Sequence, residues 1–120
     1  MTIMFYESSE GVQSQTTQTW TQVASKSGNL RASGNFLQLY AEYGGSNANK
    51  DVGIRVLVNG VEKGFDYHTP TIAGQYKAFF VFGIIEPSVE AEYTISLEVR
   101  ALDTGQTVNV RRIRLMVMQV

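Results

Sequence analysis

Apolar and polar residues alternate along most of the chain, and clusters of Gly, Asn and Ser interrupt the alternation about every ten residues. A period of two is typical of half-buried β-strands, and no stretch keeps the period of an amphipathic helix. The clusters 25–34, 44–50, 68–75 and 86–90 are polar and turn-forming. We expect them to be loops, with 44–50 and 68–75 exposed and tolerant of insertions. Strands are predicted near residues 3–6, 14–24, 35–43, 51–59, 61–67, 76–85, 91–102 and 106–118, with a further short one at 29–32.

Two hairpins are predicted in detail. Asn59-Gly60 between two alternating runs favours a two-residue turn that pairs Val58 with Val61, Ile54 with Phe65 and Val52 with Tyr67. Asp103-Thr104-Gly105 is predicted to join 91–102 to 106–118 in the same way. The apolar phase of that last strand flips at Arg111-Arg112, which indicates a β-bulge if the turn has two residues. A three-residue turn with a left-handed Gly105 would shift the pairing by one instead, and both registers stay open.

Three strands differ from the others because they are apolar on both faces: 35–43, 76–85 and 106–118. Eight strands joined by short polar loops suit an all-β, single-domain jelly-roll β-sandwich over residues 1–120, with about eight antiparallel strands. In that topology these three strands are neighbours in one sheet, so a second apolar surface faces outward. A loop or the N-terminal segment could cover this surface, but we favour self-association. The predicted interface residues are Phe36, Tyr40, Phe79, Val81, Ile85, Met116 and Met118, although period alone leaves open which set is core.

Composition removes several function classes. The 120 residues carry a net charge of −1, which argues against a nucleic-acid-binding module. The chain has no Cys and a single His, which excludes disulfides and thiolate chemistry and leaves little for imidazole chemistry. No apolar run is long enough to span a bilayer, and the first residues lack the basic opening and apolar core of a secretory signal. We therefore expect no enzyme activity, no cofactor and no metal.

The remaining candidates for chemistry are few. His68 has no second imidazole at metal-ligand spacing and is expected to be a packing or surface residue. Glu90 and Glu92 are expected to form a solvated rim, as any chain with this many carboxylates contains such pairs. Partner or ligand contacts are assigned to Arg111, Arg112 and Arg114, a cluster that could bind an anionic partner or could pair with Glu98 and Glu92, and to Trp20 and Tyr43, which could stack on sugar rings.

The arrangement resembles the jelly-roll modules of bacteriophage virions, such as capsid decoration proteins and fibre or tail heads, some of which are similar to the tumour-necrosis-factor/C1q fold. The likeness is one of texture over nearly the whole chain, without a fingerprint motif. It is carried by the Thr-rich run Thr16–Val23, by Asn35–Leu39, by Ile54–Gly60, by Tyr93–Val99 and by the final strand Val110–Leu115.

The resemblance implies a non-enzymatic virion structural protein, made in the host cytoplasm and located in the virion. The absence of a coiled-coil or collagen-like stalk favours a capsid decoration or surface subunit over a fibre. Its expected partners are copies of itself, in a homo-oligomer that we expect to be a trimer, and other virion proteins, but neither nucleic acid nor a membrane. The alternative is a carbohydrate-binding, lectin-like module with a surface glycan as its partner. A hydrolase fragment is the third reading.

Overall fold

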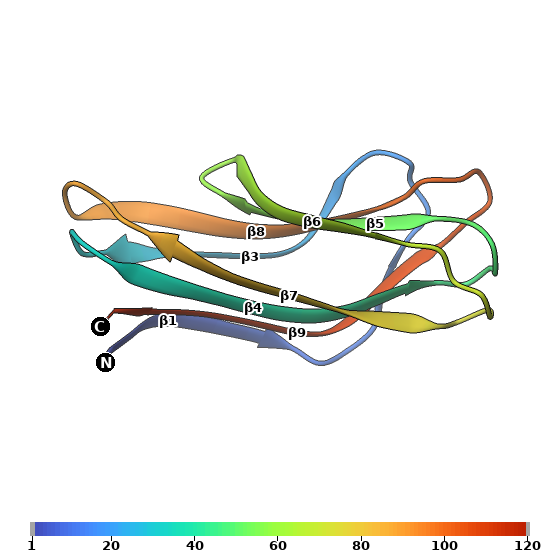
Figure 1. Ribbon diagram of the computed structural model, residues 1–120, viewed down its shortest axis with the longest axis horizontal. Coiled ribbons are helices and arrows are strands. Elements are labelled where there is room, and N and C mark those ends of the chain that lie inside the picture. Colours follow the sequence, from blue (N-terminus) through green and yellow to red (C-terminus); the bar gives the residue numbers. More distant parts are fainter. Residues whose placement is uncertain (1, 120) are drawn as a thin grey trace.

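The structure is a computed structural model that describes residues 2–119, and it forms a sandwich of two antiparallel β-sheets (Figure 1). Among these residues there are nine strands and no helix, so none of them forms a helix that could cross a membrane. The strands are β1 (Thr2–Ser9), β2 (Gln13–Gln15), β3 (Thr21–Leu30), β4 (Asn35–Gly45), β5 (Val52–Val58), β6 (Val61–His68), β7 (Tyr76–Ile85), β8 (Ala91–Ala101) and β9 (Val108–Gln119).

The strand order confirms one expectation from the sequence. One sheet runs β1-β9-β4-β7, with the short β2 paired to β9, and the other runs β3-β8-β5-β6. The three strands that are apolar on both faces are therefore neighbours, with β4 between β9 and β7. We call the first sheet the β4 sheet and the second the β5 sheet.

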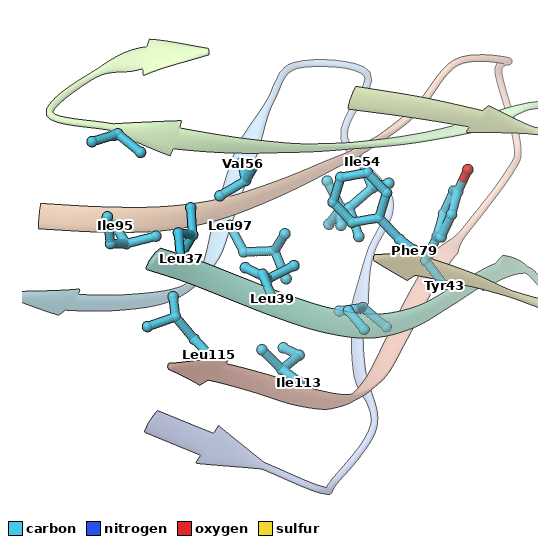
Figure 2. Close-up of a cluster of buried hydrophobic side chains, with 14 of the residues drawn as sticks. Leu37, Leu39, Tyr43, Ile54, Val56, Phe79, Ile95, Leu97, Ile113 and Leu115 are labelled. Atoms are coloured by element: carbon cyan, nitrogen blue, oxygen red, sulfur yellow. The ribbon is translucent and has the colours of Figure 1, made fainter. Parts of the chain in front are cut away.

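The core lies between the two sheets and is filled from both (Figure 2). Every second residue of the central strands points inward, as the period of a strand requires. The largest contributions to stability come from fully buried aliphatic side chains. Burying each of them stabilises the folded state by roughly 1.5–3 kcal/mol. They include Leu37, Leu39, Ile54, Val56, Ile95, Leu97, Ile113 and Leu115.

Strand boundaries differ from the prediction near the N-terminus. The run 14–24 is divided between β2 and β3. Residues 25–28, expected to lie in a loop, and residues 29–30, which begin the further short strand expected at 29–32, both continue β3. Ser25, Ser27 and Asn29 are small or polar, but they alternate with partly buried residues and pair with β8 throughout. Their side chains face water from an edge strand, so the polarity that indicated a loop belongs to one exposed face.

The first hairpin turns as predicted, but its register does not continue as predicted. Asn59 and Gly60 have φ of 49° and 79°, the left-handed pair of a two-residue hairpin turn. Val58 pairs with Val61, but a bulge between Val56 and Leu57 shifts every later pair by one. Phe65 then lies opposite Arg55, and Tyr67 lies opposite Gly53, so both aromatic rings face outward. The prediction that they pair with Ile54 and Val52 is wrong, because one extra residue reverses the face of every side chain after it.

The second predicted hairpin is wrong. The strands β8 and β9 lie in different sheets, and the segment after Ala101 crosses between them. β9 instead pairs with β4, β1 and β2, so the two alternative registers left open for this hairpin both fall away. The alternation along 91–102 is confirmed, because the side chains from Ile95 to Ala101 at odd positions are buried.

The predicted bulge in β9 is confirmed. Tyr40 lies opposite Arg114 and Glu42 lies opposite Arg111, so two residues of β9 face one residue of β4. Arg112 occupies the extra position with φ of 52°. Because of this bulge, Val108 and Val110 before it and Ile113 after it all point into the core.

Gln106 was not singled out in the sequence and organises the end of the sandwich where the chain crosses. Its side chain is 1% exposed, accepts from the backbone N–H of Asn47 at 2.9 Å, and donates to the carbonyls of Asn47 and Lys50 at 2.8 and 2.7 Å. A Cβ on Gly45 would lie 2.2 Å from its Nε2 atom, so a larger residue there would displace the Gln106 amide. The loop 44–50 is therefore fixed at its base, and Gly44 and Gly45 are buried in β4, so the expectation that all of it is exposed is wrong, while its tolerance of insertions stays a prediction.

Candidate functional site

The outward side of the β4 sheet carries large apolar side chains instead of polar ones. We call this surface the outer apolar face. In its central row Phe36 lies between Ile84 and Met118, and in the next row Gln38 lies between Phe82 and Met116. The face is formed by Ile3, Tyr6, Phe36, Tyr40, Phe80, Phe82, Ile84, Met116 and Met118.

Several side chains of this face are open to solvent. Phe80 is 62% exposed, Ile84 is 58% exposed and Phe82 is 53% exposed. The rings of Phe36 and Phe82 stack at 5.6 Å between centroids, which makes a continuous aromatic surface across β4 and β7. Isolated exposed apolar residues are common on proteins, but a contiguous patch of this kind marks an interaction site.

The face is hollowed near its middle. A cavity of about 260 Å³ is lined by Tyr6, Gln38, Tyr40, Phe80, Arg114 and Met116. Its walls are mainly apolar, and only Gln38 and Arg114 bring amide or guanidinium groups. The hollow could accept an apolar side chain, and polar groups at its rim could form a hydrogen bond with the bound segment.

The structure decides which set of β7 side chains faces outward. Phe79 and Ile85 are 5% and 7% exposed and belong to the core, and Val81 packs against that core. Their assignment to an interface is wrong, because they alternate with Phe80, Phe82 and Ile84, which hold the outward positions. The other four predicted interface residues, Phe36, Tyr40, Met116 and Met118, lie on the outer apolar face. The sequence shows that β7 is apolar on both faces, but it does not show which of the two faces packs on the core.

Ion pairs border the face at the bulge of β9. Arg111 and Arg112 both bind the carboxylate of Glu42, at 2.8 and 3.0 Å, and Arg114 binds Glu10 at 3.0 Å. Tyr40 donates a hydrogen bond to the same carboxylate of Glu42 at 2.5 Å. The arginines therefore pair with Glu42 of the β4 sheet and with Glu10, which follows β1. The suggested pairing with Glu98 and Glu92 is wrong, because those residues lie on β8 in the other sheet.

These contacts set the ionisation of the cluster. The hydrogen bond from Tyr40, followed by those from Arg111 and Arg112, lowers the pKa of Glu42 to about 2. The same hydrogen bond raises the pKa of Tyr40 above its ordinary value. Glu42 thus stays ionised over the whole physiological range and keeps both arginines in place.

Tyr43 and Trp20 do not lie together. Tyr43 is completely buried, donates a hydrogen bond to Asp66 at 2.7 Å and packs edge-on against His68 and Phe79. Burial, followed by the hydrogen bond to Asp66, raises its pKa. Its assignment as a ligand contact is wrong, because inward-facing odd positions of β4 place it in the core. Trp20 is partly buried, and the guanidinium carbons of Arg55 and Arg100 lie 4.5 and 4.7 Å from its ring centroid.

The other polar candidates do not converge. Within residues 2–119 no three His, Asp or Glu side chains come together in a way that could hold a metal ion. His68 is a packing residue, with its ring 5.9 Å from that of Tyr43. Glu90 and Glu92 are exposed, as expected of a solvated rim.

Comparisons with known proteins extend to the fold alone. No protein-family model and no curated protein sequence matches the chain. Among solved structures, the insecticidal delta-endotoxin Cry8Ea1 from Bacillus thuringiensis superposes with a TM-score of 0.56 at 14% identity, over 90% of this chain and 20% of the toxin chain. Dimeric latent PorU from Porphyromonas gingivalis gives a TM-score of 0.52 at 13% identity, over 99% of this chain and 13% of that chain. The chain thus spans a fifth or less of these neighbours, and the likeness is one of fold over the matched part.

Proposed function

We propose that this protein is a non-enzymatic structural subunit that acts by binding other protein surfaces, and that its place is in a virion as a capsid decoration or surface protein. The observation that carries the proposal is the outer apolar face. A surface sheet normally turns polar side chains to water, whereas here Phe80, Phe82 and Ile84 occupy those positions. Their exposure in a lone subunit is unfavourable, so the face is explained by a protein that covers it.

We propose further that the sandwich is a jelly roll. The strand order supports this assignment. β4 and β9 are central in one sheet and β5 and β8 in the other, and successive strands from β3 to β9 alternate between sheets except at the β5–β6 hairpin. Such an order arises when a long hairpin folds over on itself, which is how jelly rolls are built.

The first partner of the outer apolar face, in this proposal, is another copy of the chain. The three arginines at its border bind two carboxylates, those of Glu42 and Glu10, which leaves one positive charge and therefore only a weak field to repel an identical surface. Burying a large apolar side chain contributes roughly 1.5–3 kcal/mol, and each copy offers several. Closed symmetry is the rule for homo-oligomers, and we propose a trimer that then docks on the other proteins of the particle.

Mass spectrometry and labelling of purified particles from the source of this gene test the location. Stoichiometric copies on intact particles would support the virion assignment. Particles that lack the protein altogether would overturn it, whatever its oligomeric state in solution.

A further inference from the structure

The outward side of the β5 sheet carries a second cluster, which the assembly proposal does not use. It has two rows that run across the strands. In one row Tyr67 of β6, Gly53 of β5 and Arg100 of β8 are neighbours, and in the next row Phe65, Arg55 and Glu98 are neighbours. We call this the aromatic–charged cluster, formed by Trp20, Arg55, Phe65, Tyr67, Glu98 and Arg100.

The backbone itself turns the two aromatic rings of β6 outward. Without the bulge between Val56 and Leu57, Phe65 would lie on the core side. With it, Phe65 is 58% exposed and Tyr67 is 45% exposed, and their ring centroids are 5.7 Å apart. Bulges commonly redirect side chains at functional sites, and here one leaves two large aromatic rings in water.

Two glycines make this arrangement fit. A Cβ on Gly64 would lie 3.0 Å from Val81, so the inward position created by the bulge has little room for a side chain. A Cβ on Gly53 would lie 3.0 Å from the ring of Tyr67 and 3.3 Å from that of Trp20. The rings of Tyr67 and Trp20 therefore both lie close to the bare backbone of Gly53.

Planar polar groups lie beside the rings. Arg55 donates to one oxygen of Glu98 from both Nε and Nη2, at 2.7 and 2.6 Å, and this pair is partly exposed. Arg100 makes no ion pair among the residues that the structure describes, and its guanidinium lies against Trp20. The cluster thus offers fixed donors and acceptors within the same two rows as the exposed rings.

We propose that the aromatic–charged cluster is a saccharide-binding site. A sugar ring presents apolar C–H groups on its faces and hydroxyl groups around its edge. Phe65 and Tyr67 can pack on such a face, while the edge of the Arg55–Glu98 pair can donate to and accept from neighbouring hydroxyls. Charged side chains share the two rows with these rings, which distinguishes this surface from the outer apolar face, where Phe36 lies between Ile84 and Met118. The inference does not depend on the virion assignment.

A glycan array screened with the full-length protein, followed by calorimetry with the best saccharide, tests the proposal. We expect Phe65→Ala and Tyr67→Ala each to weaken binding about tenfold or more. The matched control is Val61→Ala, which removes an equally exposed apolar side chain from the same strand, outside the cluster. All three positions are exposed, and unchanged melting curves would show that the variants fold.

Two results would overturn the proposal. One is the absence of binding to any saccharide up to about 1 mM, a level at which even weak sites are occupied. The other is a saccharide affinity that Tyr67→Ala leaves as unchanged as Val61→Ala does. Because Phe80→Asp alters only the opposite sheet, that variant should bind the saccharide normally, which separates a failure of this site from a failure of assembly.

Discussion

The two outward faces of this sandwich differ although their strands share one core. The β5 sheet follows the ordinary rule over most of its surface, with hydroxyl-bearing pairs such as Ser27 and Thr94, bonded at 2.7 Å. The β4 sheet places Phe80, Phe82 and Ile84 at the outward positions of β7. Since the core between the sheets is filled from their inner faces, folding does not require the second apolar surface. The difference therefore supports the proposal that the outer apolar face is covered by a partner.

Substitutions at two adjacent residues of β7 test the difference between the core side and the outer side of the β4 sheet most directly. Phe79→Asp places an unpaired carboxylate in the core and removes a buried ring, which should cost about 3–5 kcal/mol or more and unfold the domain. Phe80→Asp adds the same charge to the solvent side and should leave a folded, soluble monomer. Chemical denaturation followed by circular dichroism measures the first effect, and light scattering measures the second. Equal destabilisation by both substitutions would contradict the assignment of the two faces.

The side chain of Gln106 holds the loop 44–50 at the end of the sandwich where the chain crosses from one sheet to the other. Gln106→Ala leaves the backbone groups of Asn47 and Lys50 without their partner, so we expect a loss of about 1–3 kcal/mol of unfolding free energy. Gln22→Ala, at an exposed position of β3, is the control and should change little. Indistinguishable urea midpoints for the two variants would show that the crossing is held by other contacts.

Acid should weaken the border of the outer apolar face. The pKa of Glu42 is about 2 in the folded protein, below its ordinary value of 4.5. A lowered pKa means that the stabilisation is complete above about pH 4.5 and is lost as the pH falls towards 2. Glu42→Gln should therefore be less stable than the wild type at pH 7 and should close that gap in this window. Parallel melting curves at all pH values would contradict the role of the cluster.

The smallest effect is expected in the loop that follows β6. Thr71, Ile72 and Ala73 are all exposed, so a short epitope inserted after Ile72 should leave the melting temperature nearly unchanged. The same insertion after Ser46 separates Ser46, whose backbone N–H donates to the carbonyl of Thr107 at 3.0 Å, from Asn47, which Gln106 holds, and it should lower the melting temperature. Equal tolerance at both sites would restore the original expectation for residues 44–50.

The sequence predicted that one sheet is apolar on both faces, but it did not predict which side chains lie on which face. Alternation predicted the all-β sandwich, most of its strands and the neighbourhood of β4, β7 and β9. It could not set the phase of β7, because Phe79 and Phe80 are equally apolar and only packing against β4 distinguishes them. The predicted pairing of Ile54 with Phe65 missed the bulge, since the extra residue carries no distinctive side chain.

The hairpin between β8 and β9 failed for a different reason. Asp103-Thr104-Gly105 has the composition of a tight turn, and Gly105 is indeed left-handed with φ of 82°. Local turn chemistry does not determine whether the chain returns beside the same strand or crosses to the opposite sheet. That choice depends on long-range contacts such as those that Gln106 makes. In the sequence, Gln106 looks like an ordinary polar residue.

The most direct test of the central claim is the mass of the wild-type protein across a dilution series, measured by light scattering. The account predicts a trimer, three times the 13.3 kDa of one chain, that holds together at micromolar concentration and is reduced to a folded monomer by Phe80→Asp. A wild type that stays monomeric at high micromolar concentration would contradict the claim that copies of the chain cover the outer apolar face.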